Sequence, residues 1–463
     1  MSKKTGKIKT ERSNSFSRTD YLCVLPGILM CTLMILILAM DLSMPEMAVM
    51  QYRSFPAMFR AVNYMIIAAG IGFYAILLVR QSTKTSQENV LRRFFVSHIN
   101  ASAIFIAGFL LCIILSTIVN GLTDKAVHGV SFRNIGIFHI AVFFLIYMVL
   151  SGSIRSRALK QVTVLLYIGT GDLIAAAVLW DRFIRPVSAF AEKKDISAIF
   201  FNGNHYGYFL VMAVLAAAGI LLYTSDIRIR IFAGCSMALN LLILLMNGSS
   251  GCLLAVCAGL LFAVPVTLLI RPDARKITVL LLCGLAVFAV ISIFIPGKAG
   301  AISGMFSSLI NDVSAVIHQS EDAAAAGHNR WLLWTETWKY IIKRPLLGYG
   351  CEGLSDVLMD SLGRANPHNE VLAYAAQFGI PAAVFYTLSI IALLIRPFIK
   401  HMNAETKNGD SLDGSCCAGL LAAFGYFISS LFGVTMFYTL PFFFIFLGLS
   451  VPDDDVYFPH LAL

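Results

Sequence analysis

About twelve stretches of predominantly apolar residues run through this chain, and each approaches the roughly 20 residues that a bilayer-spanning helix needs. Apolar residues make up 58% of the sequence, charged residues 13%, and the mean hydropathy is +0.79, which excludes an ordinary soluble domain. Open strands cannot satisfy their backbone groups in lipid, so the spans should be helices. The sequence therefore predicts an all-α polytopic membrane protein. The expected spans are 21–40, 61–79, 99–119, 134–150, 161–180, 206–223, 231–246, 251–270, 277–295, 371–395, 415–434 and 436–451.

The basic residues predict which way the spans cross the membrane. With the N-terminus inside, most of the 35 Lys and Arg fall in cytoplasmic segments, including the short loops SDIRIR and RPDARK. This orientation accounts for the net charge of +9 without a nucleic-acid partner. The expected order is a cytoplasmic basic tail (1–20), nine spans (21–295), a large extracytoplasmic loop (296–370), three spans (371–451) and a cytoplasmic tail (452–463).

Several cations nevertheless fall on the outer side, where the positive-inside rule disfavours them. A polyanionic ligand such as a pyrophosphate would explain them. Long loops also cross the membrane regardless of charge, so both explanations stay open. The outer cations are Arg182, Arg185, Lys193 and Lys194 after the fifth span, and Lys298, Arg330, Lys339, Lys343, Arg344 and Arg364 in the long loop.

The long loop also contains three of the four tryptophans. Trp331, Trp334 and Trp338 recur at helical spacing, which predicts an amphipathic helix that ends before Pro345. The segment GMFSSLINDVSAVIHQS (304–320) predicts a second, weaker amphipathic helix. The Trp helix would anchor in the outer leaflet, line a groove for a lipid-linked substrate, or do both.

Two residues of the loop are suited to chemistry. His368 opens the tenth span beside Asn369, and an imidazole can accept or orient the proton of an attacking hydroxyl. Arg330 can hold a phosphate through two parallel hydrogen bonds, although an arginine here could equally anchor the loop to lipid headgroups. The ten cysteines lie mostly in apolar spans and show no metal-ligand spacing, so we expect neither a structural metal nor a cofactor.

Three blocks of residues resemble the O-antigen ligase and O-antigen polymerase superfamily of integral membrane glycosyltransferases. One block combines Gly-x-x-Arg-Trp (327–331), RPLLGYG (344–350) and His-Asn-x-x-Leu with a later glycine (368–379). The second block is FFNGNHY (200–206), and the third is the hairpin NGSSG (247–251). Together they cover roughly residues 198–395, and their order is more specific than any one of them.

This resemblance implies a GT-C-like fold in a bacterial cytoplasmic (inner) membrane and metal-independent, inverting glycosyl transfer on its outer face. The donor would be a glycan on undecaprenyl pyrophosphate and the acceptor a sugar hydroxyl. Other partners would be membrane lipids and further polysaccharide-assembly proteins. Arg330 would hold the pyrophosphate and His368 would activate the acceptor. The expected substrate-binding residues are Arg344, Arg364, Asn369, Asn202, Asn204, Arg182, Arg185 and Trp331.

Two positions depart from the family pattern. The hairpin has Ser250 where the family usually has a phosphate-binding arginine, so that contact is missing or comes from Arg182, Arg185 or Arg344. Ala382 stands after Gly-Ile-Pro, where ligases tend to have Gly, Thr or Tyr, and this slightly weakens the ligase assignment. Polymerase and ligase share this architecture, and we favour a polymerase.

A transporter or flippase of lipid-linked oligosaccharides is the alternative from another class. Such a carrier should show two related halves and ionisable residues inside its spans. The halves of this chain differ, and Asp172 is the main ionisable residue within a span. We expect Asp172 to bond to a neighbouring helix rather than to relay protons.

Overall fold

The computed structural model describes most of the 463-residue chain, and every element in the described part is a helix, which confirms the all-α prediction. The two ends of the chain and most of the predicted span 277–295 lie outside this part, as do Lys193, Lys194 and Lys298. The described residues are 18–43, 48–82, 100–130, 133, 135–153, 157–187, 190, 196–200, 202–270, 275–279, 282–283, 301–320, 324–402 and 414–451.

Eight of the described helices are long and apolar enough to cross a membrane. Three further apolar helices are shorter. Each of these helices overlaps a predicted span, although α2 begins 13 residues before the predicted span 61–79 and one predicted span is interrupted, as described below. The eight are α1 (Arg18–Ser43), α2 (Ala48–Ser82), α4 (Ala101–Asn120), α7 (Arg157–Phe183), α9 (Gly203–Tyr223), α10 (Ile227–Asn247), α11 (Ser250–Ile270) and α17 (Ile380–Met402), and the shorter ones are α6 (Ile137–Ser153), α18 (Gly414–Ser430) and α19 (Leu440–Leu449).

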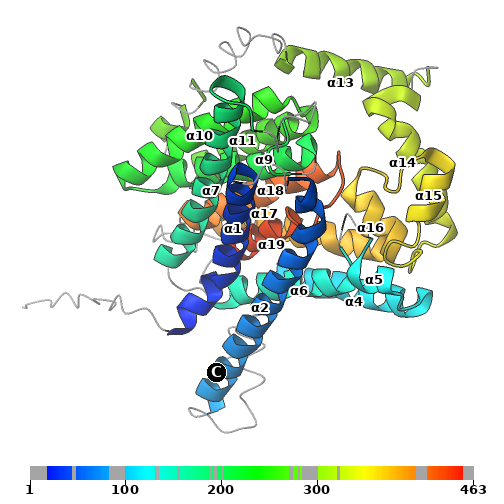
Figure 1. Ribbon diagram of the computed structural model, residues 1–463, viewed down its shortest axis with the longest axis horizontal. Coiled ribbons are helices and arrows are strands. Elements are labelled where there is room, and N and C mark those ends of the chain that lie inside the picture. The colour runs from blue at the N-terminus through cyan, green and yellow to red at the C-terminus, as the bar shows by residue number, and fades with distance from the viewer. Residues whose placement is uncertain are drawn as a thin grey trace, which may run out of the picture.

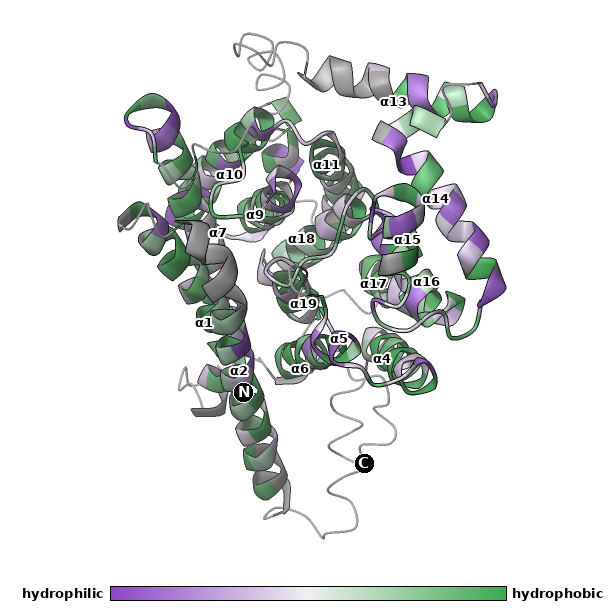
Figure 2. Ribbon diagram, turned by 45° about the vertical axis from the view of Figure 1, so that its right-hand side comes forward, coloured by the Kyte–Doolittle hydropathy of each residue, from purple (hydrophilic) through white to green (hydrophobic). Residues whose placement is uncertain are grey.

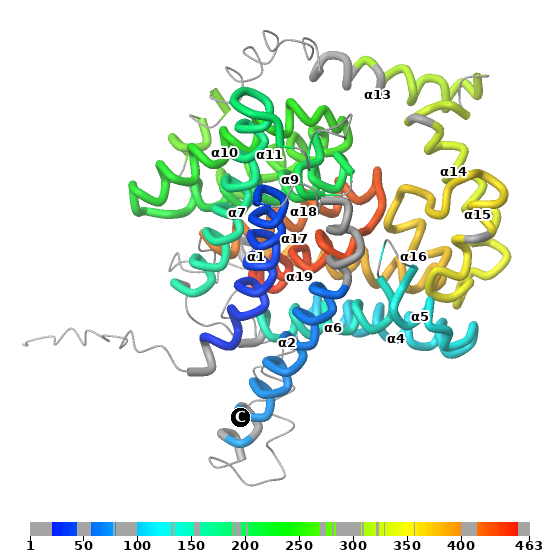
Figure 3. The backbone as a smooth tube through the Cα atoms, viewed as in Figure 1, coloured from blue at the N-terminus to red at the C-terminus, as the bar shows by residue number. Residues whose placement is uncertain are grey.

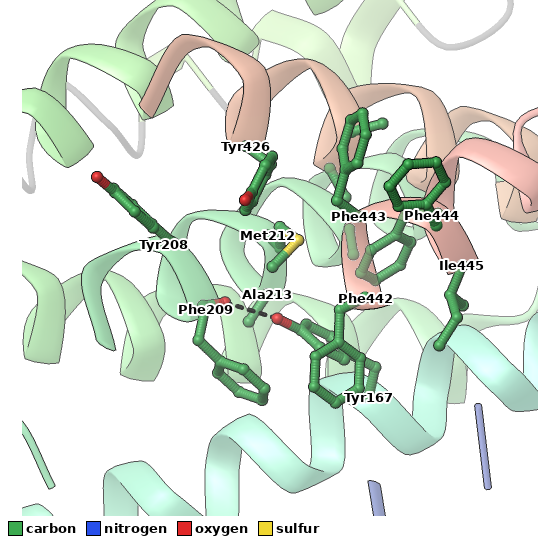
Figure 4. Close-up of a cluster of buried hydrophobic side chains, with 14 of the residues drawn as sticks. Tyr167, Tyr208, Phe209, Met212, Ala213, Tyr426, Phe442, Phe443, Phe444 and Ile445 are labelled. Atoms are coloured by element: carbon green, nitrogen blue, oxygen red, sulfur yellow. Dashed lines mark hydrogen bonds between the residues drawn. The ribbon is translucent and has the colours of Figure 1, made fainter. Parts of the chain in front are cut away.

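Helix α9 is the centre of the bundle and is buried along almost its whole length. It packs most extensively on α18 and α10, and Figure 1 shows α9 and α18 in the interior of the helix cluster. Gly219 permits a close approach, because a Cβ there would lie 2.5 Å from the backbone of Ala418. Aromatic rings fill the space beside α9, and the Tyr167 hydroxyl donates to the carbonyl of Phe209 at 3.0 Å (Figure 4).

The predicted span 371–395 is interrupted in the structure. A short helix, α16 (Glu370–Phe378), ends at Gly379, and α17 begins at the next residue. Gly379 has φ +92°, a conformation that only glycine adopts without strain, and a Cβ there would overlap the carbonyl of Leu346. The hydropathy pattern does not reveal this break, because both helices are apolar. The break allows a contact with the long loop.

That contact is made by the RPLLGYG motif, residues 344–350. The amides of Tyr349 and Gly350 donate to the last carbonyls of α16, those of Ala376 (3.0 Å) and Gln377 (2.8 Å). In return, the amide of Ile380 donates to the carbonyl of Pro345 at 2.7 Å. The motif thereby satisfies backbone groups that the end of a helix leaves without partners.

The C-terminal end of α4 also contacts the junction between α16 and residues 344–350. The Ser116 hydroxyl lies 2.5 Å from the carbonyl oxygen of Leu347 and 2.9 Å from that of Gln377. The guanidinium of Arg344 donates to the Asn120 side chain at 3.2 Å and stacks over the ring of Tyr349. Arg344 therefore has a structural role at this junction.

The long loop contains three described helices: α13 (Ala301–Ile317), α14 (Ala326–Lys343) and α15 (Ser355–Leu362). Both predicted amphipathic helices are confirmed as α13 and α14, and α14 ends directly before residues 344 and 345, as expected. Figure 3 follows the chain from α13 through α14 to α15 along one side of the molecule. Figure 2 shows hydrophilic residues along these helices, whereas the bundle helices are mostly hydrophobic.

A buried ion pair holds the long loop to the segment before α6. Arg133 and Glu352 pair directly, and each side chain is only 4% exposed. A short helix, α5 (Asp124–His128), precedes this segment. Neither α5, α15 nor the pairing of Arg133 with Glu352 was predicted, because the partners are far apart in the sequence and neither lies in a recognisable motif.

We expect Glu352→Gln to destabilise the protein by about 3–5 kcal/mol, because it leaves the buried Arg133 without its countercharge. Thermal unfolding of the purified protein in detergent would measure the effect. Glu336→Gln is the matched control: Glu336 pairs with Lys339 at 2.7 Å on the exposed face of α14, and losing such a pair costs at most about 1 kcal/mol. Equal shifts for the two variants would contradict this interpretation.

Candidate functional site

A cavity of about 390 Å³ lies where α14 approaches α9 and the hairpin between α10 and α11. Asn204 at the start of α9 and Arg330 on α14 line this cavity together with residues 248–252 of the hairpin. Phe432, which follows α18, closes another part of the wall. The FFNGNHY block and the NGSSG hairpin thus meet Arg330, which belongs to the third sequence block, at this cavity.

Asparagine side chains hold the hairpin against the start of α9. Asn247 donates from Nδ2 to the carbonyls of Ile196 (2.6 Å) and Gly203 (2.9 Å). The Ser249 hydroxyl donates to Oδ1 of Asn204 at 2.8 Å. Asn202 caps α9 by accepting from the amide of Asn204, and its own side chain is exposed. Asn204 thus lines the cavity itself, whereas Asn202 and Asn247 hold the backbone beside it.

His368 lies on a turn held by the Trp helix. The indole nitrogen of Trp334 donates to the carbonyl of Pro367 at 3.0 Å, and the amide of His368 donates to the Asn366 side chain at 2.9 Å. His368 itself has φ +54°, an uncommon conformation for a residue with a side chain. Asn369 then caps α16 by accepting from the amide of Leu372 at 3.0 Å. The backbone at His368 is thus held by contacts on both sides.

The surroundings of His368 keep its imidazole neutral. Burial, followed by the positive charges of Arg330, Arg364 and Arg133, lowers the pKa of His368 from 6.5 to about 4. Both causes disfavour the protonated ring. A neutral imidazole beside a guanidinium can accept a proton while the arginine holds an anion, which is the division of roles that the sequence predicted for this pair.

The other predicted substrate-binding residues lie away from the cavity wall. Arg364 is exposed and acts electrostatically on His368. Trp331 is 37% exposed and contacts Trp334 edge to face. Arg182 and Arg185 are exposed at the end of α7, where Arg182 approaches Asp181 at 3.8 Å. None of the proposed substitutes for the family arginine lines the cavity, whereas Ser250 itself does.

Sequence reasoning missed three buried polar groups beside the site. His205 accepts from or donates to the Tyr438 hydroxyl at 2.6 Å, and Tyr208 lines the cavity. Glu370 is buried at the start of α16, where desolvation raises its pKa, and it accepts from Tyr374 at 2.7 Å. His205 stood within a quoted motif, but its partner is 233 residues away, so no local pattern could reveal the pair.

Asp172 has the role that the sequence analysis expected. Its carboxylate on α7 accepts from Ser236 (2.5 Å) and Asn240 (2.7 Å) on α10. It therefore joins two neighbouring helices. Within the part of the chain that the structure describes, no three His, Cys, Asp or Glu side chains gather as a metal site would require.

A comparison with protein-family models identifies the region that carries this site. Residues 235–387 match the family described as O-antigen ligase. This region is therefore similar to O-antigen ligases. It contains the hairpin, Arg330 and His368, so the resemblance inferred from the motifs is confirmed. The FFNGNHY block lies outside the matched residues, yet the fold brings its Asn204 to the cavity. A search of curated proteins gave no match.

The electrostatic influence of Arg330 on His368 can be measured directly. We expect histidine-selective NMR of the purified protein to place the pKa of His368 near 4, with assignment by His368→Asn. Arg330→Gln should raise this pKa, because removing a nearby positive charge favours the protonated ring. A wild-type pKa near 6.5, or one unchanged in Arg330→Gln, would contradict the arrangement described here.

Proposed function

We propose that this protein is a glycosyltransferase that acts on glycans carried by undecaprenyl pyrophosphate. The match of residues 235–387 to the O-antigen ligase family supports a membrane enzyme of the ligase and polymerase type. The observation that best supports the specific proposal is the convergence of Arg330, Asn204 and the hairpin on one cavity, with a neutral His368 beside the arginine. Arg330 offers a cation for the leaving pyrophosphate in the cavity wall, and His368, which does not itself line the cavity but feels the charge of Arg330, offers a base for the acceptor.

In the proposed reaction, the acceptor hydroxyl loses its proton to the imidazole of His368 and its oxygen attacks the anomeric carbon of the donor sugar. The bond from that carbon to the pyrophosphate oxygen breaks, and undecaprenyl pyrophosphate leaves with the electron pair. Arg330 stabilises the charge that develops on the departing group. A single displacement from the opposite face inverts the anomeric configuration, and none of these steps calls for a metal or a nucleotide sugar.

We further propose that the cavity faces the extracytoplasmic side of a bacterial cytoplasmic membrane, with both termini in the cytoplasm. This orientation rests on the distribution of Lys and Arg over the short loops. The proposal includes twelve spans and a GT-C-like arrangement. It favours a polymerase, whose acceptor is another lipid-linked repeat, over a ligase with a different acceptor.

The first test replaces the proposed base. We expect His368→Ala to reduce glycan transfer by a factor of about 100 or more, since general base catalysis contributes roughly 10²–10⁴-fold. Purified protein would be incubated with a lipid-linked repeat unit and the products separated by size. A ladder from the wild type indicates a polymerase, whereas transfer only to a separate acceptor indicates a ligase.

His318→Ala is the matched control, because His318 is exposed just after α13. It should leave the products unchanged, and both variants should insert in the membrane at wild-type levels. An unchanged product profile for His368→Ala would remove His368 from the reaction.

The second test separates the geometry of Arg330 from its charge. We expect Arg330→Lys to lower the transfer rate by about tenfold or more, because a fork of donors becomes a point charge and a bidentate phosphate contact is lost. Arg228→Lys, at the exposed start of α10, is the control and should have no effect. Wild-type turnover by Arg330→Lys would reduce Arg330 to a membrane anchor.

A further inference from the structure

Helix α13 turns a polar side chain, rather than its apolar ones, toward the cavity. Ile310, Val313 and Ile317 are 66%, 47% and 68% exposed, whereas the half-buried Asp312 lines the cavity. An amphipathic helix of a soluble protein buries its apolar face instead. Figure 1 shows α13 along the edge of the molecule, where its apolar residues can contact lipid. The position of Asp312 is therefore not a by-product of packing apolar side chains against the bundle.

Asp312 and Arg330 bring opposite charges to one cavity without pairing with each other. Both residues line the cavity, and neither forms a hydrogen bond or an ion pair with any residue in the described part of the chain. They belong to α13 and α14, which follow each other in the long loop and are in contact. The cavity thus offers a ligand one carboxylate that accepts hydrogen bonds and one guanidinium that donates them.

These two charges restrict the chemistry of a ligand that fills the cavity. Asp312 would repel a simple anion bound at Arg330. A lipid chain would remove water from both charged groups without replacing its hydrogen bonds. A suitable ligand has an anionic group for the guanidinium and hydroxyl or N–H groups for the carboxylate, because an ionised carboxylate only accepts hydrogen bonds. A sugar that carries a phosphate has both kinds of group close together.

The remaining wall of the cavity suits a sugar ring. Phe432 is half-buried and lies beside Trp334, with 6.3 Å between the ring centroids, and its flat apolar ring can pack on the C–H face of a sugar. Asn204 adds an amide whose Oδ1 accepts from Ser249 and whose Nδ2 donates to no residue that the structure describes. The cavity volume of about 390 Å³ lies within the range of roughly 300–1,000 Å³ that is usual for small-molecule sites.

We propose that Asp312 is a specificity-determining residue that accepts hydrogen bonds from the hydroxyl or N–H groups of a sugar whose phosphate is held by Arg330. The assignment of this sugar to a lipid-linked donor rests on the proposed function. A site built to hydrogen-bond a particular group rejects a ligand without that group far more strongly than an apolar pocket does. In this arrangement α13 binds the sugar and α14 binds the phosphate.

Two ligands that differ only in the glycan test this assignment. Full-length protein in detergent would be titrated with undecaprenyl pyrophosphate and with the same lipid carrying its glycan repeat unit. We expect the wild type to bind the glycan-carrying lipid more tightly. Asp312→Asn should weaken its binding about tenfold, the loss expected for a hydrogen bond to a charged group. The same variant should bind the bare lipid more tightly, because the carboxylate no longer repels the pyrophosphate.

Opposite shifts for the two ligands separate a binding role from a structural one, because a damaged fold weakens both. Asp312→Asn keeps the shape of the side chain, and thermal unfolding would check that the variant folds. Asp360→Asn is the matched control: Asp360 is exposed on α15 in the same loop and does not line the cavity. It should bind both lipids as the wild type does.

The role of Asp312 would be overturned if Asp312→Asn changed the affinity for neither lipid or changed both in the same direction. A wild type that binds the two lipids equally, or binds neither, would also overturn it. A third titration uses the free repeat unit without the lipid and pyrophosphate. Binding of this free glycan as tightly as the lipid-linked form, and dependent on Asp312, would place an acceptor sugar in the cavity and contradict the proposal.

The proposed function fails in a different way. If the preference for the glycan-carrying lipid depends on Asp312 but the wild type transfers no glycan, the sugar site stands and the glycosyltransferase proposal is wrong. If the wild type transfers glycan and Asp312→Asn binds both lipids unchanged, the glycosyltransferase proposal stands and Asp312 has no part in the site.

Discussion

Three backbone hydrogen bonds between residues 344–350 and the junction of α16 with α17 determine where the whole site lies. They fix the end of α14 on one side and the start of α17 on the other. Gly379 makes the junction possible. A residue with a Cβ would be strained in this backbone conformation, and its Cβ would overlap the carbonyl of Leu346. Arg330 on α14 and His368 before α16 are therefore placed relative to each other by main-chain contacts rather than by their own side chains.

This arrangement allows two groups that would otherwise compete to work together. If its ring were protonated, His368 would only add a further positive charge beside the arginines. Burial and the guanidinium charges keep the ring unprotonated. Arg330 supplies the positive charge of the pair. Arg330 thus carries the positive charge and His368 can act as the base, which are the two roles that the proposed displacement with an anionic leaving group requires.

The spans and the Trp helix could be predicted because they depend on local patterns. A run of apolar residues must be a helix in lipid, and the spacing of Trp331, Trp334 and Trp338 specifies one face of another. The break at Gly379 could not be predicted in the same way. A glycine in an apolar run is common, and only the docking of residues 344–350 shows why the helix stops there.

The candidate site was likewise predictable only in part from the sequence. Motif order selected Arg330, His368 and Asn204 as candidate functional residues. It also suggested Arg344 as a substrate-binding residue, and in the structure Arg344 contacts Asn120 and Tyr349. Tyr208 carried no motif that would have singled it out. Its place in the cavity wall is a property of the packed structure alone.

The sequence by itself determined that the protein lies in a membrane, that it is helical, and which kinds of side chain gather in the long loop. Hydropathy and residue chemistry are local properties. Only the tertiary structure decided which of those residues share a cavity and which cations are structural. Those features arise from contacts between segments that are separated in the sequence, such as Ser116 with Leu347, and no pattern along the chain records them.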